Sequence, residues 1–332
     1  MGNVDLRKLH TNQRLFVKEL LSRGATVSVV DYDLELLEVT FNGKREYLLD
    51  RTNGKTAYMP SILVADKHLT KQLLRERGIT VPDGKIFLPG AINDALAYAD
   101  EVDFPLVVKP NLGSHGYLVY SGIQNHAQLE SALLSFLHHS DGKDHFLVER
   151  HIPGNEYRIF ITTKGDYAVL LREPASVVGD GKRSIRELAR EETLQRKAAK
   201  KSGDSVLCPI ALDQVALDHL RRQGLNFESV PRRGQKVPLR LSSNIAQGGI
   251  SRDMTDRAHP DAIGIAKQIL KIFDGLPCVG VDFLTADIEK KPAPGKYAIL
   301  EVNANPGIAM HHMPAFGKPR NVASYLADAI FG

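Results

Sequence analysis

Neighbouring predicted strands are separated by only a few residues, and this spacing restricts how the chain can form sheets. The apolar runs at 157–163 and 167–172 flank Lys164-Gly165-Asp166, which is a typical turn sequence. A parallel pair would need a crossover of about a dozen residues or more, so these two strands are predicted to pair antiparallel. Further strands are predicted at 25–30, 36–41, 46–49, 106–108, 117–120, 146–149, 280–284 and 298–302, and helices at 11–23, 61–77, 92–100, 126–137, 183–201 and 258–273. The predicted class is therefore α+β, with antiparallel sheets.

Composition and charge limit the classes of partner. Of the 332 residues, 43% are hydrophobic and 25% are charged, as in an ordinary soluble globular protein. The net charge of +4 is small, and the basic helix at 183–201 has no interleaved aromatic residues, so no nucleic-acid partner is predicted. No apolar run approaches the roughly 20 residues of a membrane span, and no signal peptide is expected. Cys208 and Cys278 lie far apart, which suits reduced thiols and a cytoplasmic location.

Three oxygen-bearing side chains are expected on one face of two C-terminal strands. Asp282 lies within Val279–Phe283, and Glu301 and Asn303 lie in an apolar strand that Pro306-Gly307 closes. Side chains two residues apart share a strand face, so Glu301 and Asn303 converge with Asp282 if the two strands are neighbours. Clustered carboxylates repel one another unless a cation lies between them, and Mg²⁺ prefers carboxylate and amide oxygens. We therefore predict a Mg²⁺ site, with Mn²⁺ as an alternative ion; the other interpretation is a solvated polar face.

Two lysines and a glycine-containing loop are predicted to bind phosphate. Lys109 directly follows the buried strand at 106–108, which puts its charge at the edge of a cleft. The loop behind it, Asn111-Leu112-Gly113-Ser114-His115-Gly116, has two glycines that let backbone N–H groups approach an anion. Lys67 lies early in a predicted helix. Taken singly, each feature also fits a surface lysine or an ordinary turn.

A third segment joins two predicted strands through Glu149-Arg150-His151-Ile152-Pro153-Gly154. Its backbone groups and the apolar Ile152 suit the edge and the face of a nucleotide base. Glu156 follows the turn and is suited to accept hydrogen bonds from a ribose, and Arg158 on the same strand face is suited to reach a phosphate or a carboxylate. Taken alone, the segment also fits a charged hairpin.

Taken in order, these segments resemble the ATP-grasp superfamily, above all the cyanophycin synthetases and the ligase half of the bifunctional glutamate–cysteine ligase/glutathione synthetases. The resemblance extends from about residue 60 to residue 332. The matching runs are Val108-Lys109-Pro110, Val148–Arg158, Val177–Gly181, Asn244–Thr255, Gly280-Val281-Asp282, Glu301–Gly307 and Met310–Pro314.

The resemblance implies an ATP-grasp fold, in which two α+β subdomains with antiparallel sheets clasp ATP. The implied boundaries are 1–60 for a short N-terminal α/β segment, 61–145 for the subdomain with the phosphate loop, and 146–332 for the subdomain with the metal site, which carries an insertion at 179–240. The implied activity is ATP-dependent ligation of a small-molecule acid to an amine through an acyl phosphate, with release of ADP. The implied substrates are amino acids or small peptides.

The resemblance also assigns roles to single residues. The nucleotide phosphates would contact Lys67, Lys109 and the loop residues Gly113, Ser114, His115 and Gly116. Adenine would lie against Glu149, Arg150, His151 and Ile152, and the ribose against Glu156. Mg²⁺ would be held by Asp282, Glu301 and Asn303. The transferred phosphoryl group and the carboxylate would face Arg158, Arg172, Arg240, Asn244, Gly248 and Gly249, and the substrate side would include Asn305, His311 and His312.

Two alternatives remain open. An ATP-grasp enzyme with an acceptor other than an amine would use the same nucleotide site, and so would a nucleotide-binding module without catalysis. The phosphate loop carries Leu112 and His115 where cyanophycin-type loops are richer in glycine and lysine, and the chain ends at Gly332 where those synthetases continue with a second ligase domain. The sequence therefore predicts neither the acid nor the amine, and it leaves a homo-oligomer open. The loop at 111–116 and the region 179–205 are the expected lids.

Overall fold

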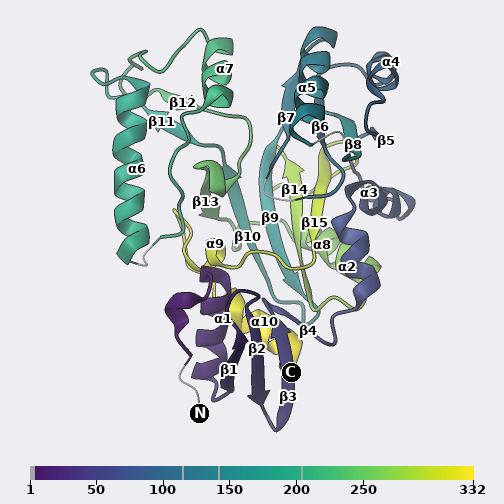
Figure 1. Ribbon diagram of the computed structural model, residues 1–332, viewed down its shortest axis with the longest axis vertical. Coiled ribbons are helices and arrows are strands. Elements are labelled where there is room, and N and C mark those ends of the chain that lie inside the picture. Colours follow the sequence, from purple (N-terminus) through teal and green to yellow (C-terminus); the bar gives the residue numbers. More distant parts are fainter. Residues whose placement is uncertain (1–3, 114–115, 141–142, 203–204) are drawn as a thin grey trace.

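The computed structural model describes residues 4–113, 116–140, 143–202 and 205–332, and within these ranges the named strands form four sheets (Figure 1). Every pairing between these strands is antiparallel, so the predicted α+β class with antiparallel sheets is confirmed. None of the helices in these ranges is long and apolar enough to cross a membrane.

The N-terminal unit is a small sheet covered by two helices from opposite ends of the chain. Its strands are β1 (Thr26–Asp31), β2 (Leu36–Phe41), β3 (Lys44–Leu49) and β4 (Thr52–Asn53), and its helices are α1 (Thr11–Ser22) and α10 (Val322–Phe331), after the short turn η1 (Leu6–Lys8). The predicted hairpin between β2 and β3 is present, and Asn42 and Gly43 both have the positive φ that its tight turn needs. Phe16, Leu20 and Leu326 form part of the shared core, so the end of the chain returns to its beginning.

The second sheet has the order β5-β8-β6-β7 and carries two helices on one face. The elements are β5 (Gly84–Phe87), α4 (Ile92–Val102), β6 (Leu106–Pro110), β7 (Tyr120–Ile123), α5 (His126–His139) and β8 (Phe146–Arg150). Leu106, Val108 and Phe146 pack under α4 and α5. Because β8 pairs with β5 and β6, a division between subdomains after residue 150 fits the pairing better than the expected division at 146. The strand expected at 117–120 begins only at Tyr120, because Leu118 has a positive φ of 53°.

Two short helices replace the single helix expected at 61–77. α2 (Tyr58–Ala65) and α3 (Lys67–Glu76) meet at Asp66, whose extended backbone ends the first helix. The Asp66 carboxylate accepts a hydrogen bond from the Leu69 N–H at 2.8 Å, which caps the second helix. This break puts Lys67 and Lys71 on the first turns of α3, next to the second sheet.

The central sheet has the order β13-β10-β9-β14-β15. Its strands are β9 (Asn155–Thr162), β10 (Tyr167–Glu173), β13 (Ile250–Asp253), β14 (Cys278–Thr285) and β15 (Tyr297–Asn303). One face packs with α8 (Pro260–Ile272), α2 and α3 around Ile159, Val281 and Ile299. The opposite face carries Arg158, Asp282 and Glu301 at one end and Phe160, which packs with the N-terminal unit, at the other. The central sheet thus connects the polar site to the N-terminal unit.

The insertion forms a compact unit with its own core. It contains β11 (Ser176–Val178), α6 (Ile185–Ser202), α7 (Gln214–Arg222) and β12 (Lys236–Pro238), and it leads into the turn η2 (Ile245–Gln247) before β13. Val177, Ile185 and Leu220 pack together inside it. In Figure 1 the insertion and the second sheet lie on opposite sides of the upper part of the molecule.

Candidate nucleotide and metal site

A buried carboxylate between two lysines lies on the inner side of the second sheet. Lys109 Nζ on β6 is 2.7 Å from Glu149 Oε2 on β8, and Lys71 Nζ on α3 contacts the other carboxylate oxygen. Burial alone would raise the pKa of Glu149, but the charges of Lys109 and Lys71 outweigh it and lower that pKa to about 2. Glu149 therefore holds both ammonium groups in place, and it is not open to adenine as expected.

Lys71 is a functional candidate that the sequence interpretation missed. It is one helical turn beyond Lys67, so the two ammonium groups lie on one face of α3. The spacing of four residues between the two lysines was the sequence signal that could have identified Lys71. Burial lowers the pKa of Lys71 to about 7, although the Glu149 carboxylate opposes this shift.

Lys67 is connected to the start of the phosphate loop. Its Nζ donates to the Gly113 carbonyl at 2.7 Å, and the Asn111 amide donates to the Asp66 carboxylate at 2.8 Å. The backbone N–H of His68 donates to the side-chain oxygen of Asn111 at 2.9 Å. The structure thus brings Lys67, Gly113 and the lysine–glutamate cluster together, while Ser114 and His115 lie outside the described residues. A Cβ on Gly116 would come within 3.2 Å of the Asn244 side chain, so Gly116 lies beside Asn244.

The turn after β8 offers fewer free donors than expected. The N–H groups of Arg150 and His151 donate to the carbonyls of Asp83 and Pro105, each at 2.8 Å, and the Arg150 guanidinium donates to the Val102 carbonyl. His151 does line a cavity of about 370 Å³ between the second sheet and the insertion. The other lining residues are Gly122, Gln124, Gln128, His219, Arg222 and Leu241.

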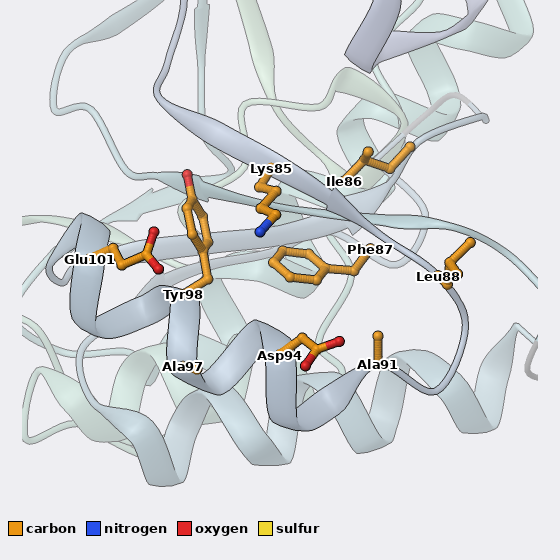
Figure 2. A pocket seen from close by; sticks show the side chains of 9 residues that line it. All are labelled: Lys85, Ile86, Phe87, Leu88, Ala91, Asp94, Ala97, Tyr98 and Glu101. Carbon is orange, nitrogen blue, oxygen red and sulfur yellow. The ribbon is translucent and has the colours of Figure 1, made fainter.

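A second cavity, of about 360 Å³, lies on the outer side of the second sheet between β5 and α4 (Figure 2). Phe87 and Tyr98 line it, and the Lys85 ammonium is 5.7 Å from the centre of each ring. This cavity contains none of the residues predicted from the sequence.

Strand register places Asp282, Glu301 and Asn303 on one face of the central sheet. Asp282 is directly opposite Glu301 on the neighbouring strand, and Gly280 is opposite Asn303. Glu301 is also near enough to Lys67 and Lys109 to act on the pKa of both lysines, so the acidic face of the central sheet lies against the lysine cluster.

Two arginines, the buried Arg158 and the partly buried Arg172, already pair with the Asp282 carboxylate. Arg158 forms a two-pronged ion pair with it, and Arg172 Nη2 lies 2.8 Å from Asp282 Oδ2. Arg172 also contacts Glu156, which accepts a further hydrogen bond from the Ser243 hydroxyl. Burial alone would raise the pKa of Asp282, but the two guanidinium charges lower it. Glu156, expected at a ribose, is thus part of a network with the two arginines expected at the phosphoryl group.

The residues at this site fit a hard cation. Asp282 and Glu301 supply carboxylate oxygens and Asn303 an amide oxygen, and the buried Asn303 Nδ2 has no hydrogen-bond partner in the described chain. Within the same ranges no three His, Cys, Asp or Glu side chains are grouped to hold a metal ion. The expected ligand set has only two carboxylates and one amide, and Mg²⁺ commonly completes its shell with substrate phosphates and water.

The structure differs from expectation around Arg240, Gly248 and Gly249. The Arg240 guanidinium is buried against Asp213, with Nη2 2.8 Å from both carboxylate oxygens. The Gly248 and Gly249 N–H groups donate within the turn η2, to the carbonyls of Ile245 and Asn244. Their expected role as donors to the phosphoryl group is therefore not supported, because a tight turn uses both groups internally. The Asn244 side chain caps the same turn by accepting from the Ala246 N–H.

Buried Arg196, on α6, connects the insertion to the same turn. Its Nη1 donates to the Gly248 carbonyl at 2.7 Å and to the Cys208 carbonyl at 3.0 Å. A lone basic residue in a charged helix gives no sign in sequence of such a contact. The region 179–205, expected to be a lid, is thus anchored at one point beside the site.

The three residues expected on the substrate side lie around α9 (Ala309–His312). Asn305 is exposed and donates to the Asp50 carboxylate at 2.7 Å. His312 Nε2 accepts from the Ala323 N–H at 3.1 Å, which is a structural contact with α10. His311 is fully buried beside Phe160, and burial lowers its pKa to about 3, so it is a neutral imidazole. The sequence did not distinguish these environments.

We expect Gly249→Ala to destabilise the protein by about 1–3 kcal/mol, the usual cost of overpacking. A Cβ at this position would meet the carbonyl oxygens of Ser243, Asn244 and Glu173 at 2.7–2.9 Å, and backbone atoms do not move aside easily. Urea denaturation measures the effect. Gly264→Ala in α8 is the matched control, because nothing lies within 4 Å of its Cβ and alanine favours a helix. Equal stability of the two variants would contradict the tight turn.

Two curated relatives align with nearly the whole chain. A cyanophycin synthetase of Geminocystis herdmanii is 34% identical over 98% of this chain and 38% of its own length. A bifunctional glutathione biosynthesis protein of Clostridium perfringens is 30% identical over 99% of this chain and 42% of its own length. The chain therefore spans less than half the length of these relatives. No protein-family model matches the chain.

A solved structure supports the same relationship. The crystal structure of a bifunctional glutathione synthetase from Pasteurella multocida matches with a TM-score of 0.69 and 28% identity, over 97% of this chain and 44% of that one. The arrangement of sheets predicted from the sequence is therefore confirmed by a fold of known structure.

Proposed function

Because this chain is related to the ATP-grasp ligases over nearly its full length, we propose that it is an ATP-dependent carboxylate–amine ligase that forms an amide bond. The observation that carries the proposal is the meeting of two opposite sets of charges. Lys67, Lys71 and Lys109 border the second sheet, and Asp282 and Glu301 lie on the facing part of the central sheet. The lysines would neutralise one end of a polyphosphate, and a cation held by the carboxylates would neutralise the other.

The proposed chemistry has two balanced steps. A carboxylate oxygen of the acid attacks the γ-phosphorus of ATP, and the bond to ADP breaks, which gives an acyl phosphate. The nitrogen of the amine then attacks the acyl carbon, phosphate leaves, and the nitrogen loses a proton. Both steps depend mainly on positioning and neutralised charge.

The chain's own residues would divide these tasks. Lys67 and Lys109 would contact the phosphates, and Glu149 would hold Lys109 in place. Asp282, Glu301 and Asn303 would hold Mg²⁺, whose charge would neutralise phosphate oxygens. Arg158 and Arg172 are oriented by Asp282 and Glu156 and would face the acid. The loop at 111–116 would exclude water from the acyl phosphate.

The relatives narrow the substrate class without naming the substrate. Both a cyanophycin synthetase and a bifunctional glutathione biosynthesis protein are among them, so we propose amino-acid or small-peptide substrates. The two cysteines are unpaired, and a cytoplasmic location belongs to the same proposal.

We expect ATP to be cleaved to ADP and phosphate only when both an acid and an amine are supplied. With ¹⁸O in the carboxylate of the acid, the label should appear in inorganic phosphate, because the oxygen that attacks phosphorus leaves with it. A screen of amino acids and dipeptides for ADP release provides the substrates, and mass spectrometry of the phosphate locates the label. Label in AMP, with release of pyrophosphate, would overturn the mechanism. ADP release with an acid alone would favour an acceptor other than an amine.

A further inference from the structure

The segment between the end of β15 and α9 is held by the N-terminal unit. This segment, Ala304–Ile308, directly follows Asn303, the last residue of the candidate metal set. Because this segment continues the backbone of β15, contacts that hold it also act on the Asn303 end of the strand. The N-terminal unit therefore touches the site without contributing a residue to it.

Asp50 and Arg51 lie in the turn after β3, and both form hydrogen bonds with this segment. The Arg51 guanidinium pairs with the neighbouring Asp50 and donates to the carbonyls of Asn305 and Pro306, each at 3.4 Å. Asp50 in turn accepts from the Asn305 side-chain amide at 2.7 Å. Arg51 and Asp50 together thus contact both the backbone and the side chain of this segment.

Two further contacts fix the segment on its other sides. The Asn12 side-chain oxygen on α1 accepts from the N–H groups of Ile308 and Ala309, both at 2.9 Å. Pro306 lies against Gly280 on β14, where a Cβ would come within 2.6 Å of the proline. Since Gly280 is opposite Asn303 in the sheet, Pro306 folds back onto the pair that contains the candidate ligand.

The buried position of Arg51 is unfavourable for a charged side chain that serves packing alone. Only 6% of it is exposed, and removing a guanidinium from water costs free energy that an apolar side chain would not. Burial accordingly lowers the pKa of Arg51, although nearby Asp50 opposes this effect. An apolar side chain has no donor for the carbonyls of Asn305 and Pro306. With such a residue at position 51, both carbonyls would lose this hydrogen bond.

We propose that Arg51, together with Asp50, is a positioning residue that directs the Asn303 end of β15 toward the metal ion. The proposal rests on the proposed function, because that function makes Asn303 a metal ligand. Groups that orient the ligands of a metal commonly alter its affinity about 10- to 100-fold when removed. Arg51 would do so through the backbone rather than by touching the metal.

The test compares Arg51→Met with Arg23→Met. Arg23 also ties two parts of the N-terminal unit together, through Asp328 at 2.6 Å and the Ser324 hydroxyl at 2.6 Å, but it contacts nothing in the site. Both variants are expected to lower the melting temperature. Free Mn²⁺ is titrated by electron paramagnetic resonance onto protein loaded with a non-hydrolysable ATP analogue, so the readout does not depend on turnover.

We expect Arg51→Met to weaken Mn²⁺ binding by about 10-fold or more, and Arg23→Met to leave it unchanged. Arg51→Lys keeps the charge but loses the fork of donors, so it should recover only part of the affinity. Asp50→Asn should weaken binding in the same direction. If Arg51→Met lowers the melting temperature but binds Mn²⁺ like the wild type, Arg51 is structural and the proposal is wrong.

The outcome also separates this proposal from the proposed function. Wild-type protein that binds Mn²⁺ with the analogue but forms no amide would contradict the ligase assignment and leave the role of Arg51 testable. Wild-type protein that ligates, with Mn²⁺ affinity unchanged in Arg51→Met, would contradict only the positioning role.

Discussion

Replacing Glu301 by glutamine is expected to reduce ATP-dependent turnover by about a thousandfold while leaving the fold intact. Glu301 is directly opposite Asp282 on the neighbouring strand, and its charge acts on both Lys67 and Lys109. Both oxygens of Asp282 are shared with arginines, so Glu301 is the carboxylate less committed to protein partners. Losing about 4 kcal/mol of metal-mediated charge stabilisation corresponds to that thousandfold change.

The measurement is ADP release at saturating Mg²⁺, with thermal unfolding to check the fold. Glu289→Gln is the matched control, because Glu289 forms only an exposed ion pair with Arg257 and lies outside the site. Surface pairs of this kind contribute little, so the control should keep wild-type turnover. Near wild-type activity of Glu301→Gln at saturating Mg²⁺ would exclude its metal role.

Strand pairing was predictable because its signals are local. The turn at Lys164-Gly165-Asp166 and the hairpin at Asn42-Gly43 lie between apolar runs, and both join antiparallel strands in the structure. Period two then placed Glu301 and Asn303 on one face, and the register of β14 and β15 brought Asp282 opposite. The break at Asp66 was missed because both flanking runs favour a helix, and the cap is a single side-chain hydrogen bond.

The partners of the site residues were not predictable from spacing. Glu149 was read as part of a nucleotide-base contact because it precedes a turn, but its partners Lys71 and Lys109 come from two other elements. Likewise, Gly248 and Gly249 offered N–H groups in sequence, but the turn η2 uses both. Arg51 lies more than 250 residues from the carbonyls that it contacts. Contacts of this kind depend on which elements pack together, and local pattern does not carry that information.

The lysine–glutamate cluster leads to the second large expectation, a loss of about 3–5 kcal/mol in the free energy of unfolding for Glu149→Gln. Glu149 is only 2% exposed and lies between the ammonium groups of Lys71 and Lys109. Removing one partner of a buried ion pair leaves an uncompensated charge, which is the costly case. Here the loss leaves the Lys109 charge uncompensated, and the Lys71 charge as well at a pH low enough to keep Lys71 protonated. Glu173→Gln is the control, since Glu173 pairs with Lys236 and Arg252 at a more exposed position and should cost under about 1 kcal/mol.

The pH dependence of this loss gives the sharper test. Burial already lowers the pKa of Lys71 to about 7, below its value in the unfolded chain, and loss of the Glu149 charge should lower it further. Between the two pKa values the unfolded chain binds more protons than the folded protein, so stability rises with pH across that window. The destabilisation by Glu149→Gln should therefore be largest at pH 6 and smaller at pH 9, where the folded lysine has lost its proton. Urea denaturation at the two pH values measures it. A loss that is equal at both, or equal to that of Glu173→Gln, would mean that Glu149 does not neutralise buried lysine charge, and Lys109 would then lose its assigned support at the phosphate site.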